Sequence, residues 1–290
     1  MNIGPIPEAL PKSVDDTISG LTVPLAKTVG ATFSDIWDIV FYGIHGVAEK
    51  RRIKVNRNVE LFKESLEVKV LAIPQEKRLE PRLQIVGPAL ERAKYCVEEE
   101  VLREMFANLI AASMDSDYAA AVHPSFPEIL AQMSPLDAQN LSLFLKIPIL
   151  PIAEYNRRSH SSAGGYTMID THVFLSNAEN QNIAAQAHSI SSLAHFGLIS
   201  ISYERHLTKE DAYDDFLKHP HYHDLKKSEI TLEKVRESTV ETPDGPWQFD
   251  NLSKDTQDKL LEQHTKEIEL QKGAVLLTPL GRAFISACLR

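Results

Sequence analysis

Three histidines lie close together in the segment HPHYH, and an aspartate follows them directly. The imidazoles of His219, His221 and His223 and the carboxylate of Asp224 are ligand types that Zn²⁺ accepts. Residues two apart on a strand share one face, so the three rings could converge on one ion. Pro220, the neighbouring charged residues and the lack of an H-E-x-x-H pattern favour a solvated loop instead. We therefore predict no metal and no cofactor, and metal binding by these histidines stays an open question.

A second chemically suggestive group lies on a predicted helix that begins near Asn182. His188 and His195 are seven residues apart, so they share a helix face with Ser191 and Ser192. A serine nucleophile needs a base that is itself oriented by an acid, together with an oxyanion hole. No GxSxG turn supplies that arrangement. An ordinary helix surface or a partner contact is favoured, and we predict no catalytic residue and no enzyme.

An apolar stripe followed by a basic cluster marks the N-terminal region. Its spacings of three and four are typical of an amphipathic helix, and two acidic residues within it disfavour a membrane span. The stripe could pack on the protein or on a second copy, or lie on an anionic membrane surface. The predicted contact residues are Val29, Phe33, Ile36, Trp37, Val40, Phe41, Ile44, Lys50, Arg51 and Arg52.

Composition narrows the class of protein. The chain has 290 residues, 43% of them hydrophobic, and a net charge of −9, which argues against general nucleic-acid binding. Cys96 and Cys288 form no disulfide framework, and no stretch reaches the roughly 18 apolar residues of a membrane span. We expect a cytoplasmic protein, with peripheral contact at the inner face of the membrane as the alternative.

The elements that must position these residues are typical of a winged helix. Residues 182–202 read as a helix, a glycine stop and a strand, and residues 273–289 read as a strand, a turn and a closing helix. Between them lies an acidic insertion at about 205–272, with helical signals at 209–219 and 253–271. Residues 182–196 hold no Lys or Arg, whereas a DNA-reading helix normally meets phosphates with both.

Local signals set further boundaries. Proline and spacing patterns predict a helix from Pro24 to about Asn58 and another over 58–73. Ser134 and Asp137 form a capping box that starts a helix. The proline-broken IPILPI favours an edge strand or a packed loop, and YTMIDTHVFLS favours a strand.

Together these patterns predict a mainly α fold, in which an N-terminal helical region precedes a winged-helix-like α+β domain with a long insertion in the wing. The expected divisions are an amphipathic segment at 1–57, a helical domain at 58–133 and the winged-helix-like domain at 134–290.

Four blocks of the sequence resemble the bacterial Abi-alpha (abortive infection alpha) family. They are KSVDDTISGLTVPLAKTVGATFSDIWDIVF, LQIVGPALERAKYCVEEEVLREMFANLIAASMD, HPSFPEILAQMSPLDAQNL and LTPLGRAFISAC, which together extend from about Ser13 to Leu289. The resemblance implies a role in phage resistance, in which an infected cell stops growing or dies. It carries over no catalytic residue.

We therefore predict a non-enzymatic phage-resistance protein that works through protein partners, a homo-oligomer or a peripheral membrane-active N-terminal helix. A winged-helix DNA-binding regulator is the alternative, and a metal-dependent hydrolase at the histidine cluster is the third hypothesis. The sequence leaves open the trigger, the molecular target, the oligomeric state and the existence of a neutralising partner.

Overall fold

The computed structural model describes residues 31–42, 49–159, 165–231 and 265–290, together with the isolated positions 233, 253, 256 and 259. These residues form two compact units: 1–138 with 282–290, and 139–281. Helices α7 (Pro135–Ser142) and α13 (Pro279–Cys288) each contribute residues to both units.

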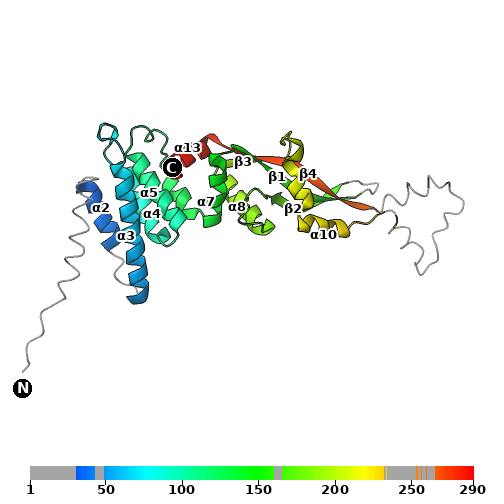
Figure 1. Cartoon of the computed structure of the whole chain (residues 1–290), viewed down its shortest axis with the longest axis horizontal. Helices are drawn as coiled ribbons and strands as arrows, with labels where there is room; N and C mark the ends of the chain where they lie inside the picture. Colours follow the sequence, from blue (N-terminus) through cyan, green and yellow to red (C-terminus); the bar gives the residue numbers. More distant parts are fainter. Residues whose placement is uncertain are drawn as a thin grey trace, which may run out of the picture. The chain divides into compact units, whose positions relative to one another are not determined.

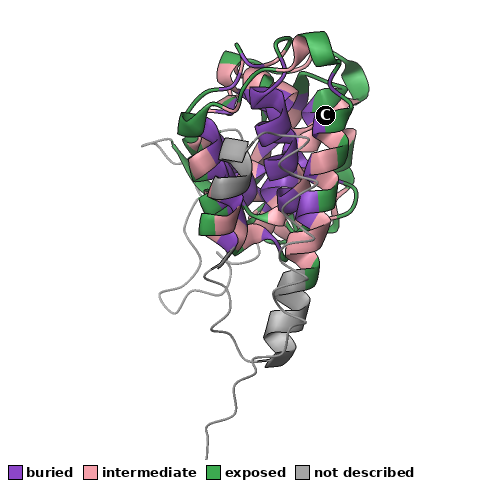
Figure 2. Cartoon of the chain, turned by 90° about the vertical axis from the view of Figure 1, so that its left-hand side faces the viewer, coloured by how far each residue is buried: buried purple, intermediate pink, exposed green. Residues whose placement is uncertain are grey.

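The first unit is helical. Its elements are α2 (Ala31–Tyr42), α3 (Glu49–Leu71), η2 (Gln75–Lys77), α4 (Leu83–Cys96), α5 (Glu100–Ser113) and α6 (Phe126–Gln132). Buried residues lie on the inward sides of these helices (Figure 2). Helix α5 contacts α3, α4 and α6, which explains why a run of its residues from Met105 onward is buried on all sides.

A buried amide closes the centre of this unit. The Asn108 side chain donates to the carbonyl of Cys288 over 2.9 Å, which satisfies one of the carbonyls left over at the end of α13. Beside it, the rings of Phe126 and Phe284 meet edge to face at 5.0 Å. The C-terminal residues 282–290 are therefore part of the helical core.

The second unit is built on a four-stranded antiparallel sheet with the order β2-β1-β4-β3 (Figure 1). The strands are β1 (Ile149–Ser159), β2 (Tyr166–Val173), β3 (Ile199–Ser202) and β4 (Lys266–Leu277). The other elements are η3 (Leu143–Leu145), α8 (Ile183–His195), η4 (Glu210–Tyr213), α9 (Asp214–Lys218) and α10 (Pro220–Lys227). Tyr213, Phe216 and Tyr222 cover one face of the sheet and form a core with Ala153 and Tyr155.

The winged-helix prediction is wrong, because this sheet has a different topology. The predicted succession of helix, strand, strand and helix is present as α8, β3, β4 and α13. However, β4 lies between β1 and β3, pairs with β1 at eleven positions and pairs with β3 at only four. The two strands of a wing pair chiefly with each other, whereas here β4 pairs chiefly with β1. The chain is therefore an α+β protein and not a mainly α protein with a winged helix.

Several local boundaries also differ from expectation. Helix α3 runs through residue 58 without a break, and β4 begins at Lys266, inside the segment predicted as a helix over 253–271. Strand β1 is an interior strand, not an edge strand. It tolerates Pro151 because its pairing with β2 starts only at Ala153, so Pro151 has a strand partner on one side.

Other local predictions are confirmed. Ser134 and Asp137 exchange hydrogen bonds of 2.8 and 3.2 Å in a capping box at the start of α7. The Asn182 side chain accepts from the N–H of Ala185 at the start of α8. Gly197 stops the helix at φ +72°, the left-handed region that glycine adopts without strain.

Candidate functional site

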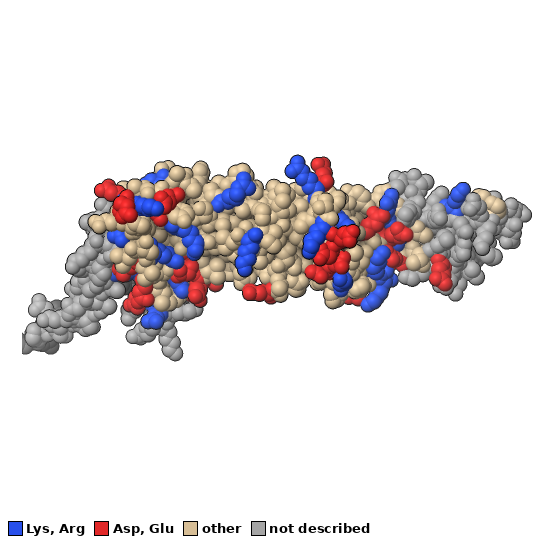
Figure 3. Space-filling model, turned by 45° about the horizontal axis from the view of Figure 1, so that its top comes forward, with Lys and Arg blue, Asp and Glu red and all other residues tan. Residues whose placement is uncertain are grey.

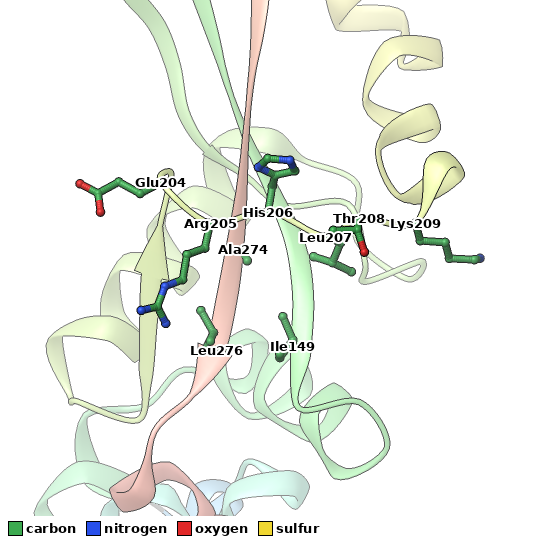
Figure 4. A pocket seen from close by; sticks show the side chains of 9 residues that line it. All are labelled: Ile149, Glu204, Arg205, His206, Leu207, Thr208, Lys209, Ala274 and Leu276. Carbon is green, nitrogen blue, oxygen red and sulfur yellow. The ribbon is translucent and has the colours of Figure 1, made fainter.

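A cavity of about 690 Å³ opens on one face of the sheet, between β1, β4 and the loop that follows β3. Its floor is apolar and consists of Ile149, Leu207, Ala274 and Leu276. The remaining lining residues are Glu204, Arg205, His206, Thr208 and Lys209. In Figure 4, Glu204 and Lys209 point away from the floor on opposite sides, whereas Arg205 extends alongside Leu276. We call this cavity the β-sheet pocket.

Strand alternation places the floor residues together. Ile149 is the partner of Leu276, and Pro151 is the partner of Ala274, so these side chains lie on one face of the β1–β4 pair. The same face carries the core of Tyr213, Phe216 and their neighbours farther along the strands. The β-sheet pocket therefore lies where the covering helices end and the apolar face of the sheet continues.

Two hydrogen-bonded anchors hold the loop that borders the pocket. At its start, the backbone N–H of Arg205 donates to the Ser202 hydroxyl over 3.3 Å. Farther along, the Leu207 N–H donates to the Tyr213 hydroxyl, which itself donates to the carbonyl of Gly273 over 2.6 Å. Because the Tyr213 side chain is buried, these bonds are shielded from water. The loop is therefore fixed to the sheet on which the pocket is built.

Tyr203 fixes the same loop from the opposite face of the sheet, and it needs a glycine to do so. A Cβ on Gly273 would lie 2.5 Å from Cδ1 of Tyr203, well inside van der Waals contact. Any side chain at this position would push the tyrosine ring off the strand. Glycine in the interior of a strand is typical where another group approaches the backbone closely.

The hydroxyl of Tyr203 is held by a β-bulge in β2. Thr171 and His172 together oppose the single residue Glu154, and His172 has φ +53°, which is rare for a residue with a side chain. The His172 N–H donates to the Tyr203 hydroxyl over 3.1 Å, and His172 Nδ1 lies 2.8 Å from the same oxygen. The bulge thus turns the imidazole toward the tyrosine.

Two hydroxyl groups flank His172 Nδ1 in this cluster. The Thr171 hydroxyl donates to the Glu154 carboxylate over 2.9 Å, and its oxygen lies 3.2 Å from His172 Nδ1. His172 Nδ1 thus lies between the hydroxyl groups of Thr171 and Tyr203. Burial raises the pKa of Tyr203 to about 12, so its phenol stays protonated.

We predict that NMR will find a His172 pKa below 6.5. Burial lowers this pKa, and the nearby Glu154 carboxylate raises it by a smaller amount. Below pH 6.5 the His172 imidazole is therefore protonated more readily in the unfolded chain than in the folded chain. The free energy of unfolding consequently falls as the pH drops below about 6.5. An ¹⁵N-detected titration of the imidazole measures this pKa. A midpoint above 6.5 would contradict the prediction.

The sequence suggested a loop for the histidine cluster, but the cluster lies at the start of helix α10. His219 is the N-cap of α10, where its Nδ1 accepts from the backbone N–H of His221, and His221 and His223 lie within the helix. Residues two apart on a helix point about 200° apart, so these rings do not share a face. His221 Nε2 instead contacts Asp170 of β2 at 2.8 Å. Among the described residues, no three His, Cys, Asp or Glu side chains form a group that could hold a metal ion.

The serine–histidine group lies on the surface of α8. His188, Ser191 and His195 are exposed, and the Ser191 hydroxyl donates to the backbone carbonyl of Ala187 over 2.7 Å. Within the described part of the chain, the Ser191 hydroxyl is therefore hydrogen-bonded to a backbone carbonyl of its own helix.

The predicted N-terminal contact residues divide into three groups. Trp37 and Phe41 are buried and lie 5.5 and 6.3 Å from the Phe62 ring of α3, while Ile36 and Val40 are half-buried. The structure places Phe33, Lys50, Arg51 and Arg52 on helices but does not describe their side chains. Val29 and Ile44 lie outside the described residues. None of the described helices has both the length and the apolar composition needed to cross a membrane.

The fold and the pocket define an α+β protein in which an antiparallel sheet carries an open apolar site with a polar and charged edge. The chain belongs to the abortive infection alpha family, whose model matches residues 54–288. No curated protein and no solved structure matches the chain. The family match thus includes residues of both compact units, and it does not extend to the N-terminal block at 12–41.

The β-sheet pocket was not predicted from the sequence. Its lining comes from residue 149, residues 204–209 and residues 274–276, which are brought together only by the pairing of β1 with β4. One signal could have indicated it. Residues 267–271 read EIELQ, an alternation of polar and apolar residues that is typical of a strand.

Proposed function

We propose that this chain is a phage-resistance protein that acts by abortive infection, so that an infected cell stops growing or dies before new phage is released. The observation that supports this function is the match to the abortive infection alpha family over residues 54–288. We place its action in the cytoplasm.

We further propose that the chain acts through a protein partner and not by catalysis. The β-sheet pocket supports this mode, because exposed apolar side chains lie both on its floor and on the segment that leads into β1. Ile149 of the floor is 41% exposed, and Leu145 and Ile147 of that segment are 53% and 52% exposed. Exposed apolar side chains grouped beside polar residues are typical of a site that another macromolecule covers.

Other modes of action have less support. The burial of Trp37 and Phe41 against Phe62 favours packing of that part of the stripe over insertion into a membrane. The DNA-binding alternative depended on a winged helix, which the sheet topology does not contain. Figure 3 shows acidic and basic side chains interspersed on the face in view, where a phosphate-binding surface would be mainly basic.

Infection of cells that express the full chain tests this function. We expect fewer plaques at low phage-to-cell ratios, and growth arrest or death of the infected cells at high ratios. A membrane-potential dye should report an intact potential when the arrest begins. Unchanged plaque numbers, or infected cells that survive and keep dividing, would contradict abortive infection; early depolarisation would contradict action through a cytoplasmic partner.

A further inference from the structure

We propose that the β-sheet pocket binds a segment of a partner protein in which a carboxylate lies beside an apolar side chain, with Arg205 pairing with that carboxylate. This inference rests on the proposed function, in which the chain acts through a protein partner. It adds the chemistry of the segment that the partner presents.

The apolar half of this chemistry follows from the floor of the pocket. Ile149, Ala274 and Leu276 come from two paired strands, and Leu207 closes the floor from the loop. An aliphatic or aromatic side chain that enters the pocket would remove this surface from water, which is the main favourable term in protein association. Ile147 and Leu145 precede Ile149 in the chain and are also exposed apolar side chains, although they do not line the pocket. A protein segment can cover them together with the pocket, whereas a small amphiphile that fills only the pocket would leave them exposed.

The carboxylate half follows from Arg205. Within the described residues, the guanidinium of Arg205 has no hydrogen bond and no ion pair, whereas the other cation of the rim, Lys209, pairs with Asp211 at 2.9 Å. Arg205 lines the same pocket as Ile149 and Leu276, so its side chain borders the apolar floor. An arginine beside an apolar surface is suited to a two-pronged bond with a carboxylate, because its planar donors match the two oxygens.

The loop presents Arg205 from a fixed backbone. Ser202 accepts from the Arg205 N–H, and Tyr213 ties Leu207 to Gly273 two residues farther along. On the other face, His172 holds the Tyr203 hydroxyl. The loop therefore loses little conformational entropy when a partner binds, which favours affinity and selectivity for one geometry.

Site-specific crosslinking in infected cells tests the proposal. A photo-crosslinking phenylalanine analogue replaces Ile147 in the full chain, and the same analogue at Leu145 serves if the first variant fails to protect against phage. We expect one crosslinked partner protein whose crosslinked peptide contains an Asp or Glu beside an apolar residue. The analogue at Val68, which is 68% exposed on α3, is the matched control and should not crosslink this partner.

Charge exchange then tests the pairing. Arg205→Glu should lower the crosslink yield about tenfold, the change that 1.4 kcal/mol produces, whereas Arg205→Lys, which keeps the charge but loses the planar pair of donors, should lower it by less. Lysine or arginine in place of the partner's carboxylate should restore the yield with Arg205→Glu. A crosslink only to a second copy of this chain, no crosslink in a protecting variant, or a yield unaffected by Arg205→Glu would overturn the inference. Loss of phage protection by the unmodified wild-type chain would instead overturn the proposed function.

Discussion

Replacement of Gly281 by alanine is expected to destabilise the protein by at least about 3 kcal/mol, the upper range for forcing extra atoms into a packed interior. A Cβ at this position would lie 2.0 Å from the carbonyl oxygen of Leu198 and 2.9 Å from its carbon. Both are backbone atoms, so no change of rotamer relieves the clash. Urea unfolding followed by far-ultraviolet circular dichroism measures the effect.

The cause of this sensitivity is the close packing at the start of α13. The Gly281 N–H donates to the Thr278 hydroxyl over 2.9 Å, and the Thr278 backbone N–H donates to the Leu198 carbonyl over 3.0 Å. These bonds hold the first turn of α13 against the turn at Gly197 and Leu198, where only glycine fits.

Gly87→Ala is the matched control for this substitution. A Cβ on Gly87, in α4, would meet no atom within 4 Å outside the neighbouring residues. Alanine gains helix propensity there, while Pro88 opposes the gain because a side chain before proline disfavours helical backbone. We expect a change of less than about 1 kcal/mol, given that each of these effects is of that size. A Gly281→Ala protein as stable as Gly87→Ala would contradict the packing described for α13.

Replacement of Ile149 by glutamate is expected to abolish protection against phage while leaving the protein folded. Ile149 is 41% exposed and lies on the pocket floor, so a longer charged side chain can reach water without breaking the core. Its carboxylate would occupy the apolar site and compete for Arg205. Plaque counts on cells that express equal amounts of soluble protein should therefore return to the number seen without the protein.

Val68→Glu is the control for this second variant. Val68 is an exposed aliphatic residue of α3 and lies in the helical unit, outside the β-sheet pocket. The same change of charge should leave both protection and the free energy of unfolding close to the wild-type values. Equal loss of protection in both variants would assign the effect to charge in general and not to the pocket.

The sequence predicted the local features of the fold well. The capping box of Ser134 and Asp137 and the Asn182 cap depend on side chains within four residues of the backbone groups that they bind, and the Gly197 stop depends on the left-handed φ of that glycine. Such short-range bonds leave a recognisable spacing in the sequence. For the same reason, the strand at 166–173 and the helix at 183–195 were predicted from their own residues.

Long-range strand pairing could not be predicted in the same way. Strand β4 pairs with β1 across more than a hundred residues, and nothing within either segment specifies that partner. The winged-helix interpretation therefore paired β4 with β3 alone. The helical assignment of 266–271 is wrong because EIELQ alternates polar and apolar residues, which is the period of a strand and not of a helix.

The candidate site was missed for a related reason. Arg205 and Leu207 appeared as part of an acidic, polar insertion, and only the fold places them beside Ile149 and Leu276. The histidines that suggested chemistry in the sequence instead have structural contacts, such as that of His221 with Asp170. No local sequence pattern indicates the role of His172, because its bulge and its contact with Tyr203 depend on strand register.

Growth of a culture infected at a high phage-to-cell ratio tests the central claim most directly. Cells that express the wild-type chain should stop growing without releasing phage. Cells that express Ile149→Glu at the same soluble level, with an unfolding free energy close to wild type, should lyse and release phage like cells that lack the protein. Growth arrest without phage release in the Ile149→Glu culture would contradict the claim that the β-sheet pocket mediates abortive infection.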